Sequence, residues 1–162
     1  MDVTVRQVDY TNSKNAADLV ELLDIYARDP MGGGEPLSPE TRANLANGLA
    51  KHAGAFSLIA YVGEEPAGLA NCFMGYSTFA AKPLVNIHDV AVKNEYRGQG
   101  IGKALFAEIE RIAARKGACK VTLEVLSENH PAKGLYASLG YGDYSLDSNT
   151  GTALFWEKRL AA

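Results

Sequence analysis

The sequence contains few of the residues and patterns that mark several large classes of protein. Its two cysteines, Cys72 and Cys119, lie far apart, so the sequence predicts neither a disulfide framework nor a zinc site. No segment approaches the roughly 18 apolar residues that a membrane helix requires, and no basic stretch followed by an apolar one opens the chain. We therefore expect a cytoplasmic protein with no membrane partner and no bound metal.

Positive charge is also scarce. The chain has 16 Lys and Arg against 19 Asp and Glu, a formal net charge of -3. A surface that follows nucleic-acid phosphates normally carries a basic stripe, so we expect no nucleic-acid partner. The 162 residues are 47% hydrophobic and 22% charged, which suits one globular domain over residues 1–162 with a continuous core.

Strand and helix patterns alternate along the chain. Strands are predicted at 3–8, 56–62, 67–76, 84–92, 119–125, 141–146 and 153–160, with hairpin turns at 63–66 and 147–151. A first helix is predicted from an N-cap at Thr11, Asn12 or Ser13 to near Asp29-Pro30, and a second from the N-cap Ser38, followed by Pro39, to about His52. Two more helices are predicted at 101–116 and within 128–141, the last closed by Gly140. The sequence therefore predicts a mixed α/β fold.

Residues 97–103, the glycine loop, carry Gly98, Gly100 and Gly102 just before the predicted helix at 101–116. Glycine lets backbone N–H groups approach a ligand, and the first N–H groups of a helix suit an anion because they lack partners within the helix. This arrangement is typical of loops that bind phosphate groups.

Spacing distinguishes three kinds of phosphate-binding loop. A P-loop has four residues between its first glycine and a Gly-Lys pair, followed by Ser or Thr, whereas three residues separate Gly98 from Gly102 and Ala104 follows Lys103. A dinucleotide fingerprint is Gly-x-Gly-x-x-Gly, whereas this chain has Gly-x-Gly-x-Gly. A loop for the pyrophosphate of coenzyme A is the third kind, and the spacing does not exclude it.

Arg97-x-x-Gly100-x-Gly102 resembles the acetyl-CoA signature of the GNAT superfamily of N-acetyltransferases. Val90-Ala91-Val92 stands where the family's apolar strand end lies, and Asn129-x-x-Ala132-x-x-Leu135-Tyr136-x-x-x-Gly140-Tyr141 is similar to its downstream motif. The resemblance implies a mostly antiparallel central sheet of about six to seven strands, with a splayed parallel pair and about four flanking helices.

The resemblance also implies how acetyl-CoA would bind. The main chain at the strand end would hold the pantetheine arm, and the amides of the glycine loop would hold the pyrophosphate. Asn129 would anchor the pantetheine, and Tyr136 would point its hydroxyl at the thioester sulfur. The implied binding residues are Val90, Ala91, Val92, Arg97, Gly98, Gln99, Gly100, Ile101, Gly102, Lys103, Asn129 and Tyr136. From the residues alone, Asn129 also suits a helix N-cap and Tyr136 a core aromatic.

Acetyl transfer to an amine needs a base, because the amine is mostly protonated at neutral pH, and a proton donor for the departing thiolate. Tyr136 is the candidate acid. The candidate bases are His88, Glu124 and Asp89 on the two predicted strands at 84–92 and 119–125. His88 is the first choice, because an imidazole changes charge near neutral pH. All three also suit structural roles.

The chain is similar to the spermidine/spermine acetyltransferases at 76–79 and at Asp89-Val90, but these carry a glutamate at the place of His88. Polyamine specificity is therefore not implied. We expect a primary amine of a small molecule or peptide as acceptor, bound between the loop at 30–37 and the last hairpin turn. Asp24, Asp29 and Glu35 could attract it, or could belong to a solvated helix end and loop.

Two further interpretations stay open. Dimers are common in the superfamily, so a homodimer is one possible assembly. A non-catalytic module that binds acyl-CoA would keep the glycine loop and lose the acid, and the presence of Tyr136 favours an enzyme instead.

Overall fold

The computed structural model describes residues 1–161. They divide into two compact units, the first ending at Leu123 and the second beginning at Glu124. The first unit contains β1 (Val3–Gln7), α1 (Ser13–Arg28), η1 (Pro30–Gly32), α2 (Pro39–Lys51), β2 (Ala55–Val62), β3 (Glu65–Ser77), β4 (Lys82–Val92), η2 (Asn94–Tyr96), α3 (Ile101–Arg115) and β5 (Val121–Leu123). The second unit contains α4 (His130–Ser138). None of the described helices is long and apolar enough to cross a membrane. One domain over residues 1–162 stays a prediction.

The five strands form one sheet in the order β1-β2-β3-β4-β5. The first four strands pair antiparallel, and β4 and β5 pair in parallel. The parallel pairing covers only residues 85–87 of β4, so β4 continues to Val92 after it has parted from β5. This confirms the predicted mixed α/β fold with a splayed parallel pair.

The strand count is lower than the predicted six to seven, because the strands predicted at 141–146 and 153–160 are wrong for the described residues. A single bridge pairs Ser145 with Thr152 there, and the turn between them is closed by the Asp147 side chain, which accepts from the Asn149 and Thr150 amides. A two-stranded hairpin is marginal without a sheet or helix to cover it, and Phe155 and Trp156 are exposed. The predicted strand at 119–125 is likewise shortened to Val121–Leu123.

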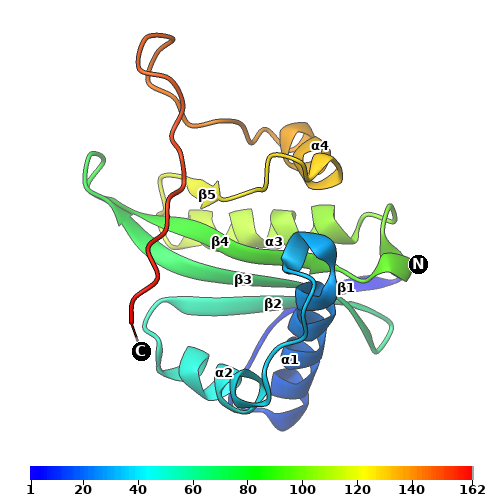
Figure 1. Cartoon of the computed structure of the whole chain (residues 1–162). Helices are drawn as coiled ribbons and strands as arrows, with labels where there is room; N and C mark the ends of the chain where they lie inside the picture. The colour runs from blue at the N-terminus through cyan, green and yellow to red at the C-terminus, as the bar shows by residue number, and fades with distance from the viewer. Residues whose placement is uncertain (162) are drawn as a thin grey trace. The chain divides into compact units, whose positions relative to one another are not determined.

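Helices cover both faces of the sheet (Figure 1). Leu69 of β3 lies opposite Ile59 of β2, and both pack with Leu19 and Leu22 of α1. Neighbouring strand residues point to opposite faces, so Gly68 points toward α3. A Cβ atom at Gly68 would lie 2.9 Å from Ile101 Cγ2, so the absent side chain lets the first turn of α3 lie directly on the sheet. That contact fixes where the glycine loop ends.

The helix starts follow from capping chemistry. Asn12 accepts from the Asn15 amide at the start of α1, and Ser38 accepts from the Thr41 amide at the start of α2, where Pro39 takes the first helical position. These side chains satisfy amides that the first helical turn leaves without partners. Both predicted starts are confirmed, and α2 ends at Lys51.

Candidate active site

The glycine loop turns the chain from β4 into α3. Gly98 and Gly100 have φ angles of 73° and 86°, in the left-handed region that side chains disfavour. Gly100 is the N-cap of α3, and no side chain among the described residues caps that helix. The first N–H groups of α3 are therefore not covered by a capping side chain, at the positive end of the helix dipole.

Two side chains of the glycine loop are tied back to the protein. Arg97 donates from Nε to the Val92 carbonyl, 3.2 Å, and from Nη2 to Asp29 Oδ2, 3.2 Å. The amide of Arg97 bonds to the Asn94 carbonyl, and Gln99 Nε2 donates to the Glu95 carbonyl at 2.7 Å. These hydrogen bonds restrict the backbone conformation of the glycine loop.

The backbone of β4 has one open edge past its pairing with β5. The Lys93 amide bonds to the Ala67 carbonyl on β3. Polar groups of successive strand residues alternate in direction, so those of Val90 and Val92 face the other edge. Within residues 1–123, no strand pairs with that edge after Ile87. It can accept an extended ligand as an added strand would be accepted.

A β-bulge interrupts β4 next to this edge. Cys72 of β3 lies opposite Ile87, and Asn71 opposite Asp89, which leaves His88 as the extra residue. Consecutive strand residues normally point to opposite faces, but the bulge turns His88 and Asp89 to the same side. Both line one pocket.

This cavity, the β3–β4 pocket, has a volume of about 380 Å³. Three polar side chains come from the sheet, Asn71 on β3 and His88 and Asp89 on β4, and Tyr26 adds a hydroxyl from α1. Most of the other lining residues belong to α1, to α2 and to the segment between them: Leu23, Tyr26, Ala27, Gly32, Leu37, Leu45 and Leu49. The ring of Phe73 completes the lining.

A chain of hydrogen bonds through Ser57 and Asn71 holds the Asp89 carboxylate in position. Ser57 Oγ donates to Asn71 Oδ1 at 2.6 Å, and Asn71 Nδ2 donates to Asp89 Oδ2 at 3.0 Å. Since Ser57 donates to Asn71, it accepts from the Tyr10 hydroxyl at 2.8 Å. Ser57 and Asn71 are both buried. The chain therefore presents an N–H group to Asp89, as a carboxylate requires.

Burial and the Asp89 charge act on neighbouring groups. Burial, and after it the Asp89 carboxylate, raise the pKa of the Cys72 thiol to about 12. Burial raises the pKa of the Tyr26 hydroxyl as well, with smaller contributions from Asp89 and Asp29. Both groups therefore stay protonated and neutral at neutral pH.

His88 is held by an aromatic contact. Its ring lies edge-on to Phe73, with centroids 5.6 Å apart, and His52 lies edge-on to the same ring at 5.2 Å. His88 is exposed, so its ring is open to solvent and to a ligand in the β3–β4 pocket.

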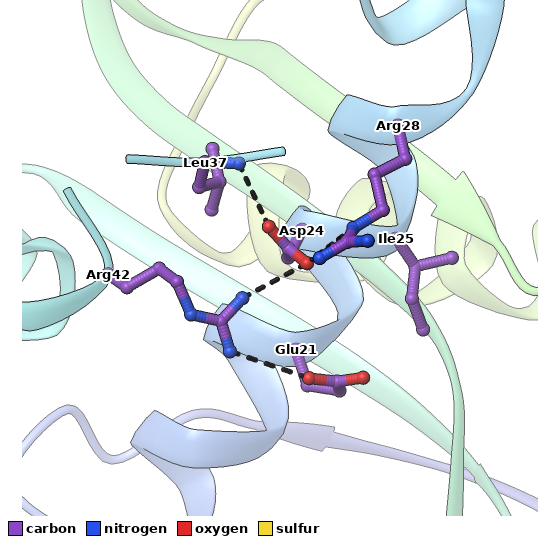
Figure 2. Close-up of a pocket in the computed structure, with 6 residues that line it drawn as sticks. All are labelled: Glu21, Asp24, Ile25, Arg28, Leu37 and Arg42. Atoms are coloured by element: carbon purple, nitrogen blue, oxygen red, sulfur yellow. Dashed lines mark hydrogen bonds and ion pairs between the residues drawn. The ribbon is translucent and has the colours of Figure 1, made fainter. Parts of the chain in front are cut away.

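Asp24 holds the segment between α1 and α2 in place (Figure 2). Its carboxylate is only 4% exposed and accepts the Leu37 amide at 2.9 Å, Arg28 Nε at 2.9 Å and Arg42 Nη1 at 3.1 Å. A second pocket of about 420 Å³ surrounds this group. Since both of its oxygens are engaged, Asp24 supports the fold of this segment.

Asp29 has a similar supporting position. It accepts the Met31 amide at the start of η1, and it pairs with Arg97. Its bond to the Met31 amide, followed by those to Arg97, outweighs burial and lowers the pKa of this carboxyl. The sequence left open whether Asp24 and Asp29 attract an amine, and in the structure both are bonded to arginine.

Replacing Asp24 by Asn should lower the free energy of unfolding by about 1–3 kcal/mol at pH 7, because the buried amide cannot satisfy the same donors. Burial alone would raise the pKa of Asp24, but the Leu37 amide and the two arginines outweigh it and hold the pKa of this carboxyl below its ordinary value. A lowered folded-state pKa gives stability that is present above the unfolded value and lost as pH falls through the folded one. The deficit should therefore shrink below about pH 4.

Urea unfolding at pH 7, 5 and 3 measures this deficit. Glu21→Gln is the matched control, because Glu21 is exposed and pairs with the same Arg42 at 3.6 Å, so its loss should cost less than about 1 kcal/mol. A deficit for Asp24→Asn that is as large at pH 3 as at pH 7 would contradict the assigned role.

The remaining predicted site residues lie in the second unit. Glu124 begins that unit and is exposed. Asn129 is the N-cap of α4, where its Oδ1 accepts from the Ala132 amide at 3.3 Å, so the helix-cap role is present. Tyr136 is half-buried on α4, and its carbonyl accepts from the Tyr141 amide.

The sequence analysis missed Asn71, Ser57 and Phe73 as parts of the site. Asn71 and Ser57 interrupt apolar strand patterns at positions that face inward, and a buried polar residue inside a strand is a usable signal, because it must have a partner. Phe73 carries no such signal, since an aromatic in a strand is ordinary core.

A family model described as the Acetyltransferase (GNAT) family matches residues 19–141. The chain belongs to this family. The match confirms the resemblance drawn from the glycine loop and from the motif at 129–141. In this GNAT chain, the matched residues include most of α1, the sheet from β2 to β5, α3 and α4.

Curated relatives of this GNAT chain align with about half of its sequence. A putative [ribosomal protein bS18]-alanine N-acetyltransferase of Bacillus subtilis is 36% identical over 76 residues, 43% of this chain and 50% of that protein. A thialysine N-epsilon-acetyltransferase of Caenorhabditis elegans is 31% identical over 83 residues, 51% of each chain. The chain thus spans about half the length of these curated relatives.

Solved structures share the fold over nearly the whole length. A possible acetyltransferase from Clostridium difficile 630 has a TM-score of 0.78 at 19% identity, covering 99% of both chains. The aminoglycoside N-acetyltransferase AAC(6')-Iy in complex with CoA has a TM-score of 0.73 at 20% identity, covering 98% of this chain and 96% of that one.

Proposed function

We propose that this protein transfers an acetyl group from acetyl-CoA to a primary amine of a small molecule or peptide, directly and within a ternary complex. The observation that carries the proposal is the course of β4. This strand leads from the β3–β4 pocket, at His88 and Asp89, along an open backbone edge to the glycine loop. A ligand with a phosphate group at one end and a reactive group at the other suits such a path.

The residues present fit acetyl-CoA. The main chain of Val90 and Val92 would bind the pantetheine arm at the open edge, with Ala91 between them; at Val92 the amide would do so, since its carbonyl already accepts from Arg97. The amides from Arg97 to Lys103, which include the uncapped start of α3, would bind the pyrophosphate. A dipole contributes only about 0.3–1 kcal/mol per charge, so direct N–H bonds must supply most of the affinity. Asn129 and Tyr136 complete the set by their place in the family motif.

Two proton transfers accompany the reaction. An alkyl amine with a pKa near 10.4 needs about 4.6 kcal/mol to lose its proton at pH 7. His88 acts as the base, since it lines the pocket and its ring is exposed, and Glu124 is the other candidate. Tyr136 gives a proton to the departing thiolate, whose thiol has a pKa near 8.5 in free form. The protein supplies binding, orientation and these two proton carriers.

Replacing His88 by Ala should lower the plateau rate about tenfold or more and remove the acidic limb of the pH–rate profile, because the base that must be unprotonated is gone. The measurement is kcat/KM for the amine between about pH 5.5 and 9. His52→Ala is the matched control, because His52 contacts the same Phe73 ring and does not line the pocket. An unchanged limb in His88→Ala would point to Glu124, Asp89 or a water chain as the base.

Binding and turnover can be tested in sequence. Acetyl-CoA, free CoA, ATP and NAD are compared for their effect on thermal unfolding, and amines are then screened at saturating acetyl-CoA. The proposal expects stabilisation by both coenzyme A species and transfer to at least one amine. Stabilisation without any transfer would favour a non-catalytic module that binds acyl-CoA.

A further inference from the structure

The two sides of the β3–β4 pocket differ in chemistry. Leu23, Leu45 and Leu49 from the helices, together with Phe73 from β3, form an apolar wall. Asn71, His88 and Asp89 come from the sheet, and on the helix side Tyr26 of α1 adds a hydroxyl, which donates to the Met31 carbonyl at 3.5 Å. A ligand in this pocket therefore meets a carboxylate and an imidazole at the sheet and mostly hydrocarbon at the helices.

Among the described lining residues, Asp89 is the one carboxylate of the pocket. Two acidic residues lie close in sequence to Tyr26 and Ala27 of the lining, and both are already engaged: Asp24 by Arg28 and Arg42, and Asp29 by Arg97. Asp89 accepts an amide proton from Asn71 and has no arginine or lysine partner among the described ion pairs. The pocket thus offers one charged site for a cation.

The size of the pocket limits the ligand further. About 380 Å³ lies at the lower end of the roughly 300–1,000 Å³ of small-molecule sites. A second ammonium group at the far end of such a ligand would lie against the leucines, where an unpaired charge is costly to bury. An apolar group there would gain about 25 cal/mol for each Å² removed from water.

We propose that the acceptor is a small primary monoamine that carries an apolar group. Asp89 binds the ammonium, His88 takes its proton, and the apolar group lies against Leu23, Leu45, Leu49 and Phe73. This inference rests on the proposed function and names the class of its second substrate.

The test compares n-hexylamine with 1,6-diaminohexane, two chains of six carbons that differ by one terminal amine, and adds spermidine as a longer polyamine. We expect kcat/KM for n-hexylamine to exceed that for either polyamine at least tenfold at saturating acetyl-CoA. An equal or higher value for the diamine or spermidine would overturn this inference while the transferase activity stands. Transfer to no amine would overturn the proposed function together with it.

Two matched variants test the wall itself. Leu45→Gln and Leu45→Glu have side chains of similar size, and only the second adds a charge. Both variants should have a lower kcat/KM for n-hexylamine than the wild type. For 1,6-diaminohexane, kcat/KM should be about tenfold higher in Leu45→Glu than in Leu45→Gln, because only the glutamate can pair with the second ammonium group. Acetyl-CoA binding reports whether the variants fold, and the wild-type comparison stands by itself if they do not. Equal diamine rates in the two variants would contradict the placement of the apolar group.

Discussion

Tyr136→Phe is expected to bind acetyl-CoA as tightly as the wild type and to turn over at least tenfold more slowly. The change removes one hydroxyl and keeps the half-buried ring on α4. A positioned general acid typically contributes about 10²–10⁴ in rate, or roughly 3–5 kcal/mol of barrier. Steady-state turnover and calorimetric binding of acetyl-CoA separate the two effects.

If Tyr136 is the general acid, the Tyr136→Phe variant should also respond to the leaving group of the acyl donor. The rate loss should be smaller for an acyl donor whose leaving thiol has a lower pKa, because a more stable anion needs a proton less. Tyr144→Phe is the control, since Tyr144 is an exposed tyrosine in the same unit and outside the family motif. Wild-type rates in Tyr136→Phe would assign the proton to water or to another residue.

Gly100→Ala should weaken acetyl-CoA binding about a hundredfold. A side chain at a φ of 86° costs roughly 1–2 kcal/mol, and the loop can relieve that strain only by turning its amides away. Two lost N–H bonds to a charged pyrophosphate, at about 1.5 kcal/mol each, amount to a factor of about 100 in Kd. Calorimetry with acetyl-CoA measures the change.

Gly117→Ala separates strain from binding. Gly117 follows the other end of α3 and has a φ of 74°, and a Cβ atom added at Gly117 or at Gly100 would have open space within 4 Å among the described residues. Both substitutions should lower thermal stability by a similar amount, but only Gly100→Ala should weaken acetyl-CoA binding. Equal affinities in the two variants would remove the glycine loop from the binding site.

Features set by local chemistry could be read from the sequence. The starts of α1 and α2 follow from Asn12 and from Ser38-Pro39, and the turn into α3 follows from the glycines at 98 and 100. Each depends on the backbone preferences of a few adjacent residues. The spacing of the same glycines also excluded two of the three phosphate-binding loops.

Features that join distant parts of the chain could not be read in this way. The pairing of Asn71 with Asp89 depends on which strands neighbour each other and in which register. Likewise, nothing adjacent in sequence to Asp24 indicates that the Leu37 amide, 13 residues further on, will bond to it. The strands predicted at 141–146 and 153–160 failed for the opposite reason: their local β-propensity was present, but no neighbouring strand pairs with them among the described residues beyond the single Ser145–Thr152 bridge.

The bulge in β4 has a consequence for how such an enzyme can change over generations. His88 is the residue without a counterpart on β3, so Ile87 and Asp89 keep their opposite faces whatever side chain lies between them. A substitution at position 88 therefore alters the chemistry of the pocket while Ile87 keeps its place in the core. The spermidine/spermine acetyltransferases that this sequence resembles have glutamate there, a different titratable side chain at the same backbone position. A change of side-chain chemistry at this position is thus uncoupled from the evolution of the fold.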